Sequence, residues 1–189
     1  PQEHYHGRDH THLHGRENDH EHHHHVRRGL SDIDGIITGL DVSEKVKSDV
    51  RAVFSIVAEA EARVHGETPD NIHFHELGTL DAVADITAVC MLMEMLAPDR
   101  VLASPVHVGA GHVHCAHGVL PVPAPATALI LKNVPIYGGS VQGELCTPTG
   151  AALLKYFADD FGRMPVMKPS AIGYGLGTKE FENNANCLR

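Results

Sequence analysis

The stretch from Leu80 to Leu96 constrains the fold most, because it is apolar on nearly every side of the helix that it predicts. That pattern is typical of a helix buried within a domain, not of one that lies on its surface. A second helix is predicted upstream, where Ser43 is the expected N-cap, valines recur at spacings of four and three, and Gly66 ends the pattern. We therefore expect the 80–96 helix at the centre of the domain.

Helices and strands are mixed along the rest of the chain. Ser31 is the expected cap of a short helix that reaches Leu40, and residues 100–109 are typical of a strand. Residues 123–133 predict a helix opened by proline, and residues 147–162 predict another, ended by a glycine. With no internal repeat, this order predicts an α/β or α+β fold in which a small mixed sheet is covered by helices.

The first 29 residues have a composition of their own. Ten histidines lie between His4 and His25 among charged residues and glycines, so this tract cannot bury enough apolar surface to offset the entropy of ordering it. We expect a disordered His-rich tail, residues 1–29, followed by one globular domain, residues 30–189. A natural reservoir for divalent metal is favoured over a solvated linker, because neutral imidazole binds such ions well. An engineered tag is disfavoured because the longest histidine run is short and the other histidines are dispersed; the run consists of His22, His23, His24 and His25.

Composition excludes several classes of protein. A formal net charge of −9 argues against a nucleic-acid surface, and the absence of any apolar run of about eighteen residues argues against a membrane span. The four cysteines lie far apart with no CxxC pair, which is typical neither of a disulfide framework nor of a zinc ribbon. We expect a cytoplasmic protein in a reducing compartment, and the sequence leaves open whether it is a homo-oligomer.

The block from Asn71 to Ile86 carries the first candidate metal ligands. In an extended segment, His73 and His75 point to the same side, and Glu76 adds a second type of ligand. This spacing predicts a two-histidine half-site. A polar loop with one buried, hydrogen-bonded histidine explains an isolated HxH equally well.

Two carboxylates follow on the predicted 80–96 helix. Asp81 and Asp85 lie four residues apart on one face of the first two turns, where the positive end of a helix favours negative charge. The helix dipole alone explains both residues. Asp85 lies further inside an otherwise apolar helix, however, and a buried carboxylate must find a cation, a donor or a proton. We therefore expect a functional role for at least one of the two.

A second block, HVHCAHG, repeats the logic of the first. His112 and His114 share a face of a predicted strand, and His117 follows them. Cys115 supplies a soft thiolate suited to nickel or zinc, although a small apolar residue at a strand end explains it too. His107, one strand earlier, is better explained as a core histidine bonded to a carbonyl than as a ligand.

Phosphate is the other group that the sequence could bind. Thr147 is the expected N-cap of the 147–162 helix, with Thr149 and Gly150 beside its free backbone donors, and helix starts of this type bind anions readily. A plain capped helix explains the same residues. The later GYGLGT segment differs from the dinucleotide fingerprint, and its alternate glycines indicate a close approach of backbone or ligand.

Four signatures of the sequence point to one family: HFHELGTLDAVADI, CAHGVLPVPAPAT, ELCTPTGAALL and AIGYGLGT. They resemble the nickel insertion proteins that finish the nickel-pincer nucleotide cofactor of lactate racemase. The resemblance implies a lyase of the metal chelatase type. In a CTP-dependent step, such an enzyme places nickel into a pyridinium mononucleotide bearing two thiocarboxylates and leaves the metal bonded to two sulfurs and one ring carbon.

The resemblance also implies separate roles for the candidate residues. The tail would collect nickel, the two histidine blocks would hold it beside the ring, and one of Glu76, Asp81 and Asp85 would accept the ring proton. Family members begin with a further N-terminal segment and end with a C-terminal region linked to CTP. This chain therefore resembles a middle fragment, and we expect CTP to bind beyond it. Two other classes stay open: a nickel storage protein or metallochaperone without catalysis, and a metal-dependent hydrolase.

Overall fold

A computed structural model describes residues 29–72, 80–115, 118–181 and 184–189. The described α-helices are α1 (Leu30–Thr38), α2 (Glu44–His65), α3 (Leu80–Leu96), α4 (Pro125–Ile130) and α5 (Pro148–Phe157), and a 3₁₀ turn, η1, spans Pro69–Asn71. The strands are short: β1 (Leu102–Ala103), β2 (Val106–His107), β3 (Gly109–Ala110), β4 (His112–Cys115), β5 (Gly118–Pro121), β6 (Ile136–Tyr137), β7 (Gly143–Glu144), β8 (Asp160–Phe161), β9 (Gly175–Leu176) and β10 (Cys187–Leu188).

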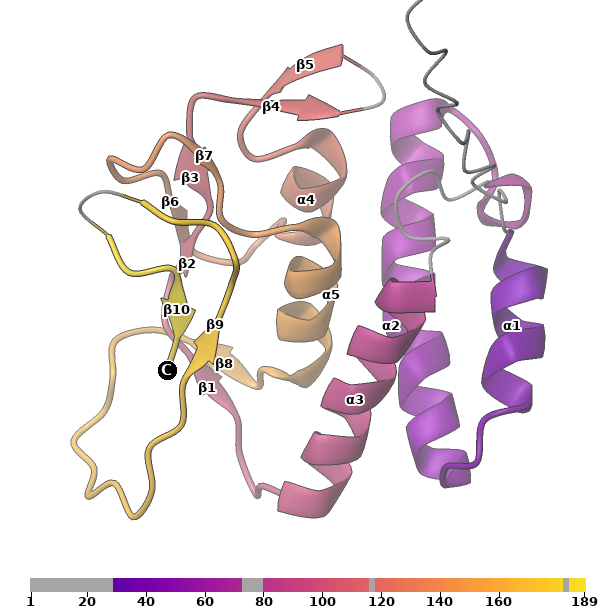
Figure 1. The fold of residues 1–189 in the computed structure, drawn as a ribbon, viewed down its shortest axis with the longest axis horizontal. Coiled ribbons are helices and arrows are strands. Elements are labelled where there is room, and N and C mark those ends of the chain that lie inside the picture. The colour runs from indigo at the N-terminus through magenta and orange to yellow at the C-terminus, as the bar shows by residue number, and fades with distance from the viewer. Residues whose placement is uncertain (1–28, 73–79, 116–117, 182–183) are drawn as a thin grey trace, which may run out of the picture.

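Helices and strands occupy different sides of the molecule. Figure 1 shows α1, α2 and α3 on one side, α4 and α5 in the middle, and the short strands on the other side. The helix α2 packs against α1, α3, α4 and α5, so the hydrophobic core surrounds it. This arrangement confirms the expected mixture of helices and small sheets. None of the described helices is long and apolar enough to cross a membrane.

The sequence of α2 explains its central place. At its start, the backbone N–H of Val46 donates to Ser43 Oγ (3.1 Å), and at its end Gly66 adopts a φ of 68°, which glycine tolerates best. Both predicted helix boundaries are therefore confirmed. Between them, Val53 and Phe54 are at most 1% exposed, as the spacing of the apolar residues requires.

The prediction that the 80–96 helix is buried at the centre is wrong. The helix α3 has the predicted bounds, but it packs against α2 and α5 through one side only. Its buried residues are Ala82, Val83, Ile86, Thr87 and Cys90, whereas its exposed large apolar residues are Leu80, Met91, Leu92, Met95 and Leu96. An apolar helix is buried all round only if neighbours surround it, and the described residues supply neighbours on one side.

Several other helix ends differ from their predicted positions, and α4 spans Pro125–Ile130 rather than 123–133. The N-cap of α1 is Gly29 rather than Ser31, and the backbone N–H of Gly29 donates to the carboxylate of Asp32 (2.9 Å). The helix α5 ends at Phe157 rather than at Gly162. The residues after it turn to form β8, which pairs with β1, and a strand partner cannot remain in the helix.

Short pairs of strands replace the single strand predicted over 100–109. Within the described ranges, β1 and β2 pair in parallel with β8 and β6, while β3–β7, β4–β5 and β9–β10 are antiparallel. Ser104 and Pro105 separate β1 from β2, because proline has no N–H to donate to a partner strand. Where β3 pairs with β7, a Cβ on Gly109 would overlap the carbonyl oxygen of Gly143, and both residues have positive φ. This pair of strands therefore requires glycine at both positions.

Candidate metal site

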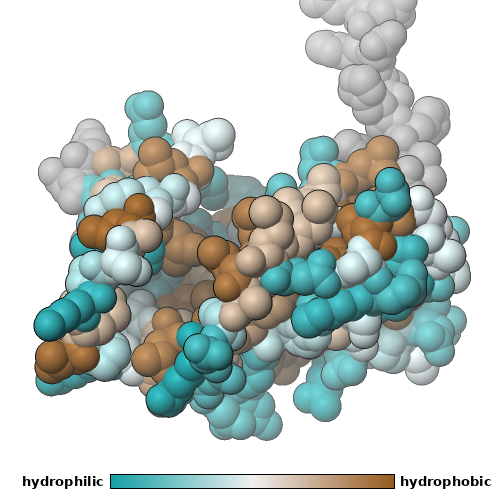
Figure 2. Space-filling model, turned by 90° about the horizontal axis from the view of Figure 1, so that it is seen from below, coloured by the Kyte–Doolittle hydropathy of each residue, from teal (hydrophilic) through white to brown (hydrophobic). Residues whose placement is uncertain are grey.

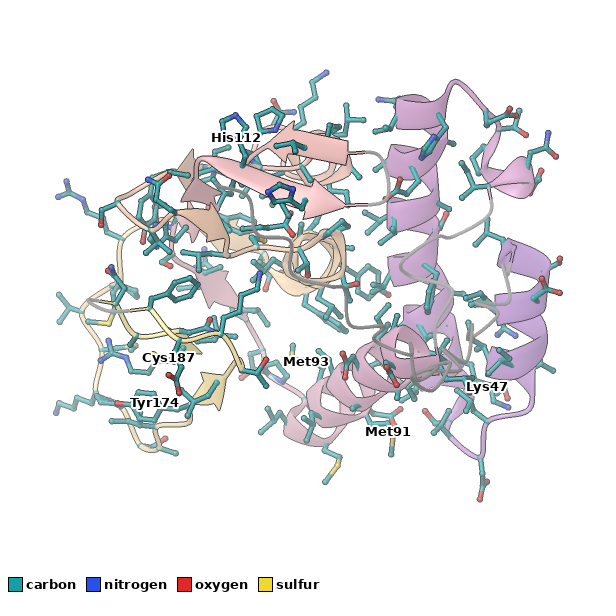
Figure 3. The ribbon with its side chains drawn as sticks, turned by 45° about the horizontal axis from the view of Figure 1, so that its top comes forward. Lys47, Met91, Met93, His112, Tyr174 and Cys187 are labelled. Atoms are coloured by element: carbon teal, nitrogen blue, oxygen red, sulfur yellow. The ribbon has the colours of Figure 1, made fainter. Side chains whose placement is uncertain are left out.

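The β4–β5 hairpin presents two of the predicted metal ligands. His112 pairs with Pro121 and His114 pairs with Val119 in an antiparallel register. Because side chains alternate along a strand, both imidazoles lie on one face, and both are exposed, whereas Val113 between them is half-buried. Figure 3 shows His112 at the outer edge of the molecule. The hairpin therefore offers two nitrogen ligands to solvent.

Backbone contacts hold the base of this hairpin. The N–H of Val122 donates to the carbonyl oxygen of Gly111 (3.0 Å), and the N–H of Ala110 donates to that of Val141 (2.9 Å). Gly111 has a φ of 79°, and a Cβ there would lie 2.5 Å from the side-chain oxygen of Gln142. A larger residue at this position would have to displace Gln142 or tilt the hairpin. The two imidazoles thus stand on a supported pair of strands.

Most of the other predicted ligands lie outside the described residues: His22, His23, His24, His25, His73, His75, Glu76 and His117. Cys115 is the last residue of β4. Within the described ranges, no three His, Cys, Asp or Glu side chains come together in a way that could hold a metal ion. Of the predicted ligands, the structure therefore brings together His112 and His114.

The two candidate carboxylates of α3 are exposed. Asp81 lies in the first turn of the helix and Asp85 one turn later, and both point away from the side that packs against α2. The expectation that Asp85 is buried is wrong, because α3 buries the opposite side, which carries Val83 and Ile86. Neither carboxylate needs a buried cation, and both are accessible to a substrate or to a partner.

The start of α5 is a capped helix terminus, as predicted. The backbone N–H of Gly150 donates to Thr147 Oγ1 (3.3 Å), Pro148 occupies the first turn, and Thr149 is half-buried. The cap uses the Gly150 donor that an anion would need. The geometry of the described residues therefore explains Thr147 without a ligand, and a phosphate would have to displace this hydrogen bond.

The imidazole of His107 interacts with a backbone carbonyl and with an aromatic ring. Its Nε2 lies 2.7 Å from the carbonyl oxygen of Gly138, and its ring stacks on Tyr137 with 4.5 Å between centroids. A Cβ on Gly139 would overlap the imidazole, so only glycine lets the ring lie there. The prediction of a histidine bonded to a carbonyl is confirmed.

One polar cluster was missed by the sequence analysis. Asp49 lies on the apolar side of α2 and is 6% exposed. Its carboxylate accepts hydrogen bonds from Lys45 Nζ (2.6 Å) and from the hydroxyl of Tyr156 on α5 (2.8 Å). The available signal was an aspartate three residues after Val46 and one before Val50, inside the valine stripe. This cluster ties α2 to α5 and lies away from the hairpin elements.

The surroundings of Asp49 raise the pKa values of three neighbouring groups. Burial, followed by the hydrogen bond to Asp49, raises the pKa of Tyr156 to about 12. Burial raises the pKa of the Cys90 thiol to about 11, and the negative charge of Asp49 adds to the effect. The hydrogen bond to Asp49 also raises the pKa of Lys45. Asp49 therefore stabilises the protonated form of each of these groups.

Comparison with known proteins places the chain in a family. A family model described as "Nickel insertion protein" matches residues 2–189. The "Pyridinium-3,5-bisthiocarboxylic acid mononucleotide nickel insertion protein" of Geobacillus kaustophilus is 43% identical over 166 residues, which is 88% of this chain and 40% of that protein. The protein of the same name from Staphylococcus saprophyticus is 44% identical over 160 residues, which is 85% of this chain and 40% of the relative.

A third relative agrees with these two. The "Putative nickel insertion protein" of Dictyoglomus thermophilum is 42% identical over 158 residues, 84% of this chain and 41% of its own length. The chain thus spans about two fifths of the length of the curated relatives that it matches. No solved structure matches it. Because the family model covers nearly every residue, the chain belongs to the nickel insertion protein family.

Proposed function

We propose that this chain forms part of an enzyme that inserts nickel into a pyridinium-3,5-bisthiocarboxylic acid mononucleotide, the compound in the names of its relatives. The observation that carries the proposal is the 43% identity to such a protein over 88% of this chain. The exposed pair of His112 and His114 supports it, because neutral imidazole is a good ligand for nickel. The chain covers two fifths of that relative, so the complete activity would draw on further polypeptide.

In this proposal nickel is the cargo and the histidines are its carriers. His112 and His114 would hold the ion on the hairpin face while the substrate approaches. The remaining ligands would come from the two histidine blocks, and the tail would deliver the metal: His73, His75, Glu76, Cys115 and His117 for the blocks, and His22, His23, His24 and His25 for the tail.

The insertion step must remove one proton from the pyridinium ring. In the proposed product, nickel is bonded to two sulfurs and one ring carbon. The C–H bond breaks, its electron pair forms the nickel–carbon bond, and the proton passes to a base. Asp81 and Asp85 are accessible carboxylates for this role, and Glu76 is the third candidate.

The substrate phosphate and CTP would bind at different places. The substrate phosphate would meet the start of α5 at Thr147, Thr149 and Gly150. The step would depend on CTP, bound by the part of the longer family members that this chain does not cover. The product would be the nickel-pincer cofactor of lactate racemase, which makes the enzyme a lyase of the metal chelatase type.

A transfer experiment tests the proposal. The chain, together with the remaining region of a longer relative, is loaded with nickel and mixed with the pyridinium substrate, with and without CTP. Mass spectrometry should then detect a product that has gained nickel and lost the ring proton, and only with CTP. Nickel that stays on the protein, with no modified nucleotide, would contradict insertion.

A nickel storage protein or metallochaperone is the second candidate, and one observation favours it. Ten histidines between His4 and His25 can bind metal without any catalytic step. The same transfer experiment separates the two functions, because a carrier releases nickel to a chelator but forms no nickel–carbon bond.

Replacing His114 tests the hairpin directly. We expect His114→Ala to weaken nickel binding in a chain that lacks residues 1–28, which keeps the Gly29 cap of α1, and His65→Ala on α2 to leave it unchanged. Binding should also weaken in acid, because protons compete with nickel for the imidazole nitrogen. Titration with nickel measures both effects, and equal affinity in the two variants would remove the hairpin from the site.

A further inference from the structure

The outward side of α3 is apolar and has no covering neighbour among the described residues. Met95 is 78% exposed and Leu96 is 73% exposed, and Met91 and Leu92 are exposed one turn earlier. Figure 3 shows Met91 on the outer side of the helix, and Figure 2 shows hydrophobic surface gathered around a hollow on the underside of the molecule. Large contiguous apolar surfaces are rare on free proteins and mark places where another surface binds.

This side of the helix also carries the two candidate carboxylates. The residues on this side of α3 recur every three or four positions, and every one of them is exposed. We call this set the outer α3 face: Asp81, Ala84, Asp85, Ala88, Met91, Leu92 and Met95. The acidic residues lie at the start of the helix and the large apolar residues at its end.

The strands show a second kind of uncovered surface. Within the described ranges, β1 and β2 each have a single strand partner, so their other edges have no ladder. An edge of this kind carries N–H and C=O groups that can pair with an added strand. Among the residues that the structure describes, neither this side of α3 nor the second edges of β1 and β2 have a packing partner.

A second copy of this chain is a poor occupant for the outer α3 face. The helix contains no Lys or Arg. If two copies packed through α3, the Asp81 and Asp85 carboxylates of both would enter the interface with no cation from either helix, and an unpaired buried charge is strongly unfavourable. The occupant must combine apolar side chains with basic groups or N–H donors.

We infer that the outer α3 face is the docking surface for the polypeptide that longer family members carry beyond the matched region. The Geobacillus kaustophilus relative has 60% of its length outside the part that this chain matches, so such a partner exists in the family. Its apolar side chains cover Met91, Leu92 and Met95, and its donors or basic side chains face Asp81 and Asp85.

Docking on this face would also affect nickel insertion, a step that rests on the proposed function. The two carboxylates leave bulk solvent when the partner docks, so a ring proton would be accepted at an interface between two parts of the protein. Insertion then requires both parts, whereas nickel binding by the hairpin does not.

Co-production of the two parts tests the inference without nickel or nucleotide. The 189-residue chain is produced in one cell with the unmatched region of the Geobacillus kaustophilus relative, and the complex is isolated and its dissociation constant measured. We expect a one-to-one complex with the unaltered chain. Met95→Lys should weaken it at least about tenfold, as hot-spot residues do. Val64→Lys, at an exposed apolar residue on α2, is the matched control and should have no effect.

Each other outcome overturns the inference. These outcomes are the absence of a complex, equal weakening by Met95→Lys and Val64→Lys, and a homodimer that only Met95→Lys dissociates. Circular dichroism shows whether each variant is folded. As a second readout, a maleimide should label Met95→Cys at least about tenfold more slowly in the complex than in the free chain. Because nickel and substrate are absent, failure here leaves nickel insertion untouched, and failure of insertion leaves this result standing.

Discussion

The helices α2 and α3 lie side by side, and they use apolar residues in opposite ways. In α2 the apolar residues form one stripe that four other helices cover, and even Asp49 inside that stripe has two hydrogen-bond partners. In α3 apolar residues occur all round, yet the described residues cover one side. The difference shows that an apolar pattern alone does not determine how much of a helix is buried. Burial also depends on which other elements pack against the helix.

The largest expected difference between the two helices is in stability. Phe54→Ala in α2 should lower the free energy of unfolding by about 3–5 kcal/mol, because it leaves a cavity in the core. Met95→Ala on the outer α3 face should change it by less than about 0.5 kcal/mol. Urea denaturation followed by circular dichroism measures both. A loss of similar size in Met95→Ala would mean that the outer face is packed in the isolated chain.

The next largest expected effect is on the rate of nickel insertion, for which two carboxylates on α3 and one just before it are the candidate bases. At least one of Glu76→Gln, Asp81→Asn and Asp85→Asn should lower the rate of nickel insertion about 10²-fold, the scale of a lost general base, while nickel still binds. The rate is measured in the complex of both parts, by mass spectrometry of the product. Asp70→Asn, at an exposed acid in η1, is the control. Normal rates in all three variants would assign insertion to metal positioning alone.

Removing the buried carboxylate of α2 should have a smaller effect on stability. Asp49→Ala leaves the hydroxyl of Tyr156 and the ammonium of Lys45 without their acceptor, and should cost about 1–3 kcal/mol. Glu59→Ala, on the exposed side of the same helix, should be nearly neutral. Urea denaturation of both variants makes the comparison. Equal values would show that the Asp49 cluster contributes nothing to holding α2 against α5.

The smallest effect is a dependence of stability on alkaline pH. An unfolded tyrosine loses its proton near its ordinary pKa of about 10, whereas Tyr156 in the folded chain keeps it to about 12. The folded state therefore binds more protons in this window, and stability falls as the pH rises from 10 towards 12. Tyr156→Phe should make this fall shallower. Denaturation midpoints at several pH values above 9 measure it, and parallel curves would contradict the assignment.

Helix boundaries were predicted best, because they depend on residues within one turn of the chain. Ser43, Gly66 and Thr147 act as predicted, since a cap needs only a hydroxyl or a free φ beside the first or last donors and acceptors. The prediction that Ser31 caps α1 was wrong. Gly29 starts α1 instead, with Asp32 as the acceptor for its N–H.

Burial was predicted worst, because it depends on segments far away in the sequence. Asp85 was predicted to be buried and is exposed, whereas the burial of Asp49 was not predicted although it lies inside the valine stripe. The partner that covers Asp49, Tyr156, lies 107 residues further along the chain. No pattern within α2 specifies that contact.

The candidate site was predicted in part. The period of two along a strand was enough to place His112 and His114 on one face. A carbonyl partner for His107 was also predicted, but the sequence could not show that Gly138, the residue after β6, provides it, because the two residues lie 31 positions apart.

The pairing of β3 with β7 limits which substitutions this protein can accept over evolutionary time. Alanine is the smallest step away from glycine, and neither Gly109 nor Gly143 can take it: one methyl group would strike a backbone oxygen, and the other would force a rare backbone conformation. The clash at Gly109 cannot be relieved by trimming a neighbouring side chain, because the obstacle is the main chain of Gly143. Descendants of this sequence must therefore keep glycine at both positions of the β3–β7 pair, through which the chain enters the hairpin.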